Sequence, residues 1–96
     1  MSPKNKKKLD EIRKKLDKID NKLLVIIKKR TSLVNDVVKL KENKSEIVDQ
    51  KRISSILKNI RIKSIKKNID PKITNRIWKN MIWSYINYER RIFKKK

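Results

Sequence analysis

The sequence predicts an all-α protein of three helices, and three observations lead to that fold class. Apolar residues recur at steps of three and four from Leu9 to Leu40, a spacing that places them on one face of an α-helix. No proline or glycine interrupts residues 4–70, so long helices can form there. The motif NIDPK at residues 68–72 then supplies a stop and a restart for a further helix.

The first helix is expected over residues 7–42. Its apolar face is formed by Leu9, Ile12, Leu16, Ile19, Leu23, Ile26, Leu33, Val37 and Leu40. At roughly 1.5 Å per residue such a helix is about 54 Å long, whereas a compact chain of this size has a radius of gyration of only about 12 Å. Because the helix is longer than its own domain, it requires a partner.

A second helix is expected over residues 50–67. The preceding segment ENKSEIV, residues 42–48, breaks the periodicity and is expected to be a loop. Asp49 is a suitable N-cap, because its carboxylate can accept a hydrogen bond from a free backbone N–H of the first turn. The residues predicted to face inwards are Ile53, Ile56, Leu57, Ile60 and Ile65.

A third helix is expected over residues 71–93, within a single domain of residues 1–96. Asn68 can adopt the left-handed conformation that ends the preceding helix. Asp70 can cap the new helix, and Pro71 suits its first turn because the missing N–H costs nothing there. Two neighbouring apolar stripes are predicted to be buried, Trp78, Ile82, Tyr85 and Ile92 in one, and Ile73, Ile77, Met81 and Tyr88 in the other.

The composition limits the possible functions. The net charge of +20 is compatible with nucleic-acid binding, because clustered cations displace counterions from a phosphate backbone. However, a chain rich in Lys, Ile and Asn and without Gly or Ala is also typical of a coding sequence poor in G and C. We favour the interpretation that much of the lysine is solvated surface.

Several classes of chemistry are excluded by residues that the chain lacks. It has no cysteine and no histidine, which removes thiol chemistry, disulfides, histidine-based triads and the usual zinc sites, and we expect no metal or cofactor. The longest apolar run, LLVII, is too short to span a membrane. The basic N-terminal residues lead into no apolar stretch of signal-peptide type, so the cytoplasm is the expected compartment.

Two ionisable residues fall in gaps of the apolar faces. Arg30 interrupts the face of the first helix, and Glu89 interrupts a stripe of the third. An unpaired buried guanidinium or carboxylate costs several kcal/mol, so each must pair or bind a ligand. They could pair with each other, or Arg30 could set the register of a coiled coil.

The spacing of further cations favours a ligand site. Lys41 lies 11 residues after Arg30, so the two project from nearly the same side of a helix about 16 Å apart. Arg13 lies 17 residues before Arg30, about 25 Å away and too far to share a small site within one chain. In a two-fold dimer, Arg13 of one chain can approach Arg30 and Lys41 of the other. Such a pocket suits a small anion with more than one carboxylate.

The sequence resembles the all-helical chorismate mutases from about residue 9 to residue 93. The likeness rests on LDEIRKKLDKIDNKLLVIIKKR, VVKLK and DQKRISSIL, with an Arg in EIR, an Arg 17 residues later and a Lys 11 residues after that. The segment IWKNMIWSYINYE is also similar to the related isochorismate-pyruvate lyases of salicylate synthesis. The resemblance implies an intertwined homodimeric helical bundle with two equivalent pockets.

The resemblance also implies roles for individual residues. Arg13 from the partner chain would bind one substrate carboxylate, Arg30 the other, and Lys41 would donate to the ether oxygen of the enolpyruvyl bridge. Glu89 lies where the bacterial enzymes usually have a Gln that donates to the same oxygen. Further substrate contacts would come from Val37, Lys51, Ile82, Tyr85 and Ile86.

Some positions depart from the family's pattern. Lys51 stands where a Glu commonly holds the substrate hydroxyl, and Gln50 stands where many members have an Arg. Glu89 would have to be protonated in order to donate. Burial favours the neutral carboxyl and the nearby cations favour the ionised one. In an alternative arrangement, Glu89 pairs with Lys51.

The activity implied is that of a chorismate mutase, an isomerase that rearranges chorismate into prephenate on the way to the aromatic amino acids. This intramolecular transfer needs a folded substrate and a neutralised ether oxygen, with no covalent intermediate or cofactor. The alternative within the fold is an isochorismate-pyruvate lyase. The alternative from another class is a basic helical nucleic-acid-binding protein.

Overall fold

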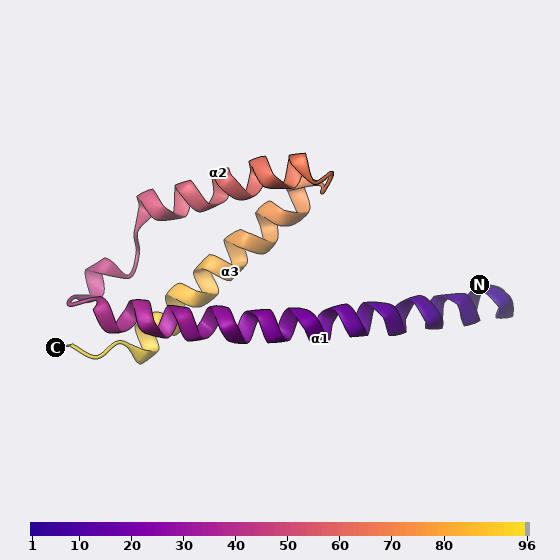
Figure 1. Cartoon of the computed structure of the whole chain (residues 1–96), viewed down its shortest axis with the longest axis horizontal. Coiled ribbons are helices and arrows are strands. Elements are labelled where there is room, and N and C mark those ends of the chain that lie inside the picture. Colours follow the sequence, from indigo (N-terminus) through magenta and orange to yellow (C-terminus); the bar gives the residue numbers. More distant parts are fainter. Residues whose placement is uncertain (96) are drawn as a thin grey trace. The chain divides into compact units, whose positions relative to one another are not determined.

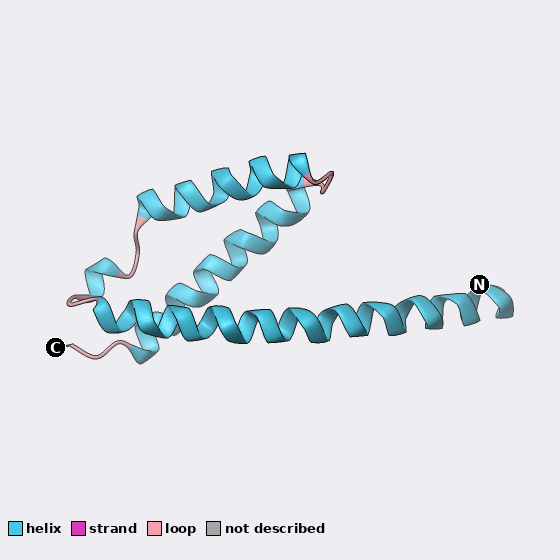
Figure 2. Cartoon of the chain, in the orientation of Figure 1, coloured by secondary structure: helices cyan, strands magenta, loops and turns pink. Residues whose placement is uncertain are grey.

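The computed structural model describes residues 1–95 and consists of three α-helices and a short 3₁₀ turn (Figures 1 and 2). The elements in chain order are α1 (Pro3–Leu40), η1 (Lys44–Glu46), α2 (Gln50–Lys66) and α3 (Pro71–Ile92). Within the described residues there is no strand. The prediction of an all-α chain with three helices and a very long first one is therefore confirmed.

The chain divides into two compact units. The N-terminal unit, Met1–Leu33, contains the two residues that precede α1 and the helix itself up to Leu33. The C-terminal unit begins at Val34 and contains the last turns of α1 together with η1, α2 and α3. The expectation of one domain over residues 1–96 stays a prediction.

The first helix begins earlier than residue 7, where the sequence placed its start. The hydroxyl oxygen of Ser2 accepts a hydrogen bond from the backbone N–H of Asn5 at 3.2 Å, which satisfies one of the free donors of the first turn. Pro3 is the first helical residue, a position where proline is tolerated because its missing N–H would have had no partner. These two residues allow α1 to extend through the N-terminal lysines.

The same helix ends at Leu40, two residues before the predicted end. The backbone N–H of Lys41 donates to the carbonyl of Val38 at 3.1 Å, a three-residue spacing that tightens the last turn. The segment 42–48, predicted to be a loop, contains the short turn η1. The chain therefore reverses direction within a few residues after α1.

The predicted helix caps are confirmed. The carboxylate of Asp49 accepts a hydrogen bond from the backbone N–H of Arg52 at 3.0 Å, and that of Asp70 accepts one from Lys72 at 2.9 Å. Asn68 has a φ of 59°, the left-handed conformation that closes α2. Both α2 and α3 end one residue before the predicted positions, a difference within the usual variation of helix ends.

A small apolar core holds the C-terminal unit together. Ile47, Ile82 and Ile86 are buried at its centre, and the hydrophobic residues packed against them are Val48, Ile53, Ile56, Leu57 and Phe93. Ser64 and Thr74 are also buried, and their hydroxyl oxygens are hydrogen-bonded at 2.7 Å. This polar pair joins α2 to α3 near the turn that connects them.

Three isoleucines that the sequence placed on inward faces are more than half exposed. They are Ile65 on α2 and Ile73 and Ile77 on α3. All three lie towards the α2–α3 turn, whereas the core residues of these helices lie towards the other ends. Helical periodicity predicts which residues share a face, but it does not show whether another element covers that face.

The apolar face of α1 is exposed over most of the N-terminal unit, although Leu9 is half-buried. Its residues Ile12, Leu16, Ile19, Leu23 and Ile26 are 49–58% exposed. Among the described residues, no helix is both long enough and apolar enough to cross a membrane.

Candidate active site

The C-terminal unit brings two of the predicted site residues into direct contact. The Nζ atom of Lys41, which follows α1, donates to Oε1 of Glu89 on α3 at 3.0 Å. The two side chains are only 17% and 10% exposed. Bulk solvent screens such a pair less than a surface pair, so the ammonium and the carboxylate attract each other more strongly here than at an exposed site.

Lys41 is the cation that pairs with Glu89, in place of the Lys51 considered from the sequence. Lys51 is exposed on the first turn of α2. The tight turn that ends α1 directs the chain so that Lys41, rather than a residue of α2, reaches the buried carboxylate. Glu89, the residue in the gap of the apolar stripe, is thus paired with a residue that follows a different helix.

A shallow cavity of about 610 Å³ lies beside Lys41, a volume within the range of small-molecule sites. Its lining residues are Lys41, Glu46, Val48, Asp49, Gln50 and Lys51. Lys41 and Lys51, two of the predicted binding residues, therefore share one cavity. The sequence reasoning missed Glu46 and Val48, because the segment that contains them was expected only to be a loop.

The remaining candidates of the C-terminal unit differ in burial. Ile82 and Ile86 belong to the core, and Val37 is exposed. Tyr85 is half-buried and lies edge-to-face against Tyr88, with ring centroids 6.4 Å apart. Their contact with a substrate stays a prediction.

The two candidate arginines belong to the N-terminal unit. Arg13 is exposed on α1, and Arg30 on the same helix is half-buried. Their binding of substrate carboxylates also stays a prediction.

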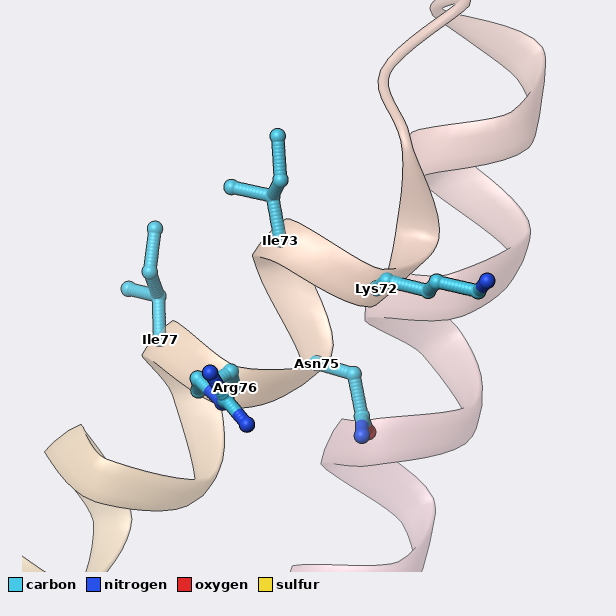
Figure 3. A pocket seen from close by; sticks show the side chains of 5 residues that line it. All are labelled: Lys72, Ile73, Asn75, Arg76 and Ile77. Carbon is cyan, nitrogen blue, oxygen red and sulfur yellow. The ribbon is translucent and has the colours of Figure 1, made fainter.

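A further shallow cavity of about 620 Å³ lies on α3 (Figure 3). Ile73 and Ile77 project from one side of the helix, and Lys72 and Asn75 project from another. None of the predicted site residues lines this cavity. In the part of the chain that the structure describes, no three acidic side chains gather in a way that could hold a metal ion.

The comparison with protein families shows which family the chain belongs to. The family model described as chorismate mutase type II matches residues 12–90. The chain belongs to the chorismate mutase type II family. All five charged candidates, namely Arg13, Arg30, Lys41, Lys51 and Glu89, fall within the matched range. No curated protein and no solved structure matches the chain.

Membership of this family confirms the resemblance found in the sequence and agrees with the three-helix fold. The activity is that of a chorismate mutase, an isomerase with chorismate as its substrate. Such an enzyme acts on an anionic substrate, and the largely buried ammonium of Lys41 is the group of the C-terminal unit best suited to that chemistry. It can stabilise negative charge on a bound substrate without any nucleophile or metal.

Proposed function

We propose that this chorismate mutase converts chorismate to prephenate with Lys41 as the donor to the ether oxygen of the enolpyruvyl bridge. The supporting observation concerns the ammonium of Lys41. Its side chain is only 17% exposed, it lies 3.0 Å from the carboxylate of Glu89, and it lines a cavity whose volume is within the range of small-molecule sites. Negative charge develops on the ether oxygen in the transition state, and a preorganised, poorly solvated cation stabilises it more than a solvated one.

Glu89 acts as the second donor in this proposal. Its carboxylate accepts the hydrogen bond of Lys41. An ionised carboxylate beside the developing oxyanion would oppose the charge that Lys41 stabilises. We therefore propose that Glu89 donates to the same oxygen in its protonated form.

The carboxylates of the substrate are bound by two arginines from different chains. Arg30 binds one carboxylate and Arg13 of a second copy binds the other, while Lys51 contacts the substrate hydroxyl. Binding by Arg13 of a second copy requires a homodimer. The exposed apolar face of α1 supports such a dimer, because a second copy of the chain offers an equivalent face against which this one can be buried. The apolar contacts of the substrate come from Val37, Ile82, Tyr85 and Ile86.

The choice of substrate is tested by incubating the purified protein separately with chorismate and with isochorismate. Formation of prephenate from chorismate, lost in Lys41→Ala, supports the proposal. Salicylate and pyruvate from isochorismate, without prephenate from chorismate, would instead identify an isochorismate-pyruvate lyase. If neither substrate reacts, and the protein binds nucleic acid with an affinity that falls steeply as the salt concentration rises, the result would support a nucleic-acid-binding protein instead.

A further inference from the structure

We propose that the C-terminal unit has a second ligand site, which binds a small carboxylate with an apolar body. The site is a cavity of about 570 Å³ between the last turns of α1 and the C-terminal end of α3. Its volume lies within the range of small-molecule pockets. None of its lining residues is a candidate for the mutase site, so the inference is independent of the proposed function.

The floor of this second site is apolar and held in place. Val38 is buried, Ile92 is half-buried and the ring of Tyr88 lies beside them. The hydroxyl of Tyr88 donates to Oδ1 of Asn35 at 2.6 Å, and the guanidinium of Arg91 lies 5.9 Å from the centre of its ring. An aromatic side chain fixed at both its hydroxyl and its face provides a preformed surface for a flat or branched apolar group.

The rim of the site is cationic. It is formed by Lys39 at the end of α1 and by Lys94 and Lys95 after α3, and no ion pair to any of the three is found in the described residues. Among the described residues, no Asp or Glu lines the cavity. Because Oδ1 of Asn35 accepts from Tyr88, the NH₂ group of that amide is a further donor.

The combination of these features defines the ligand class. A cationic rim alone would attract any anion, and an apolar floor alone would favour neutral molecules. Together they favour a compound that places a ring or a branched chain on Tyr88 and a carboxylate among the lysines. An arylalkyl carboxylate has this shape, and it is small enough to enter a cavity of this volume.

The test is a titration of the full chain with 3-phenylpropionate, followed by NMR signals of the Asn35 side-chain amide and the Tyr88 ring. Saturable shifts at both residues are expected. The neutral isostere 3-phenylpropanamide and the small anion acetate should each bind several-fold more weakly, because each lacks one of the two features. Equal binding of the amide, or shifts confined to the surroundings of Lys41 and Glu89, would overturn the proposal.

Three variants locate the site. Asn35→Asp keeps an oxygen acceptor for Tyr88 but adds a negative charge to the cavity, and it should abolish saturable binding. Lys39→Ala should raise the Kd roughly two- to fivefold, as expected for one partly exposed cation. Lys79→Ala removes an exposed lysine of α3 that does not line the cavity, and the Kd should not change. Binding that survives in Asn35→Asp, or that falls equally in the two lysine variants, would contradict a site at this place.

Discussion

Single substitutions at the contact between Lys41 and Glu89 are expected to have the largest effects on activity. Replacing Lys41 by alanine removes the proposed donor to the ether oxygen, and it leaves the buried carboxylate of Glu89 without its partner. We expect Lys41→Ala to lower kcat for chorismate by about 10²- to 10³-fold. The measurement is the steady-state consumption of chorismate. Lys44→Ala removes a nearby exposed lysine that does not line the cavity, and it should retain full turnover.

The second residue-scale prediction concerns the charge at position 89. An ionised carboxylate would oppose the negative charge that develops on the ether oxygen, whereas the amide of a glutamine is neutral and can donate to that oxygen. We therefore expect Glu89→Gln to raise kcat for chorismate. The measurement is the kcat of both proteins under the same conditions.

A matched control is Glu46→Gln, which neutralises a carboxylate that lines the cavity beside Lys41. This variant should keep the kcat of the wild type, because Glu46 is not the partner of Lys41. A kcat of Glu89→Gln below that of the wild type would contradict the role proposed for Glu89.

At the scale of the elements, the helix caps can be tested separately from the chemistry. Asp70 accepts a hydrogen bond from the backbone of the first turn of α3. Its replacement by alanine should lower the free energy of unfolding by about 0.5–2 kcal/mol. The measurement is urea denaturation at a fixed protein concentration. Asp36→Ala, which removes an exposed carboxylate within α1, should change the free energy by much less.

The elements also show how far the sequence alone could lead. Caps and turns were predictable because Asp49, Asn68 and Asp70 act on backbone groups within a few residues of themselves. Burial was less predictable. Ile82 is in the core, whereas Ile73 and Ile77 on the same helix are exposed, because burial depends on which element packs against a face.

The candidate site was predictable only in part, for the same reason. The gap in the apolar stripe of α3 identified Glu89 as unusual, but its partner Lys41 lies 48 positions away in the chain. Likewise, Asn35 and Tyr88 are 53 positions apart, and no local pattern connects them. Such pairs depend on the packing of helices that the periodicity of each helix does not specify.

For the whole molecule, the proposed homodimer depends on the apolar face of α1. Leu16 lies on that face and is 53% exposed, so Leu16→Asp should place a charge in the dimer interface and favour the monomer. The measurement is sedimentation velocity over a range of concentrations. Asn21→Asp introduces the same charge elsewhere on α1, and this variant should remain dimeric. A wild type that sediments as a monomer at all concentrations would contradict the homodimer.

Mixing two inactive variants can test whether Arg13 is contributed by the partner chain. If each site uses Arg13 of one chain and Lys41 of the other, re-assembling Arg13→Ala with Lys41→Ala gives mixed dimers with one intact site. Half of the dimers are then mixed, so activity should return to roughly one quarter of the wild type.

The matched control for this experiment mixes Arg30→Ala with Lys41→Ala. Both residues serve the same site from one chain in the proposal, so no intact site can form and activity should stay low. Equal recovery in the two mixtures would contradict the assignment of Arg13 to the partner chain.

The end of α1 gives the length of this helix a meaning beyond packing. Lys41 is the first residue after the helix, and its backbone closes the last turn on Val38. One residue more within α1 would rotate the following side chain by about 100° and advance it by about 1.5 Å, away from Glu89. The C-terminus of a helix also has a partial negative charge that favours a cation there. The length of α1 therefore determines where the positive charge of Lys41 lies. Insertions in the last turns of α1 should be tolerated far less than insertions in the segment between α1 and α2.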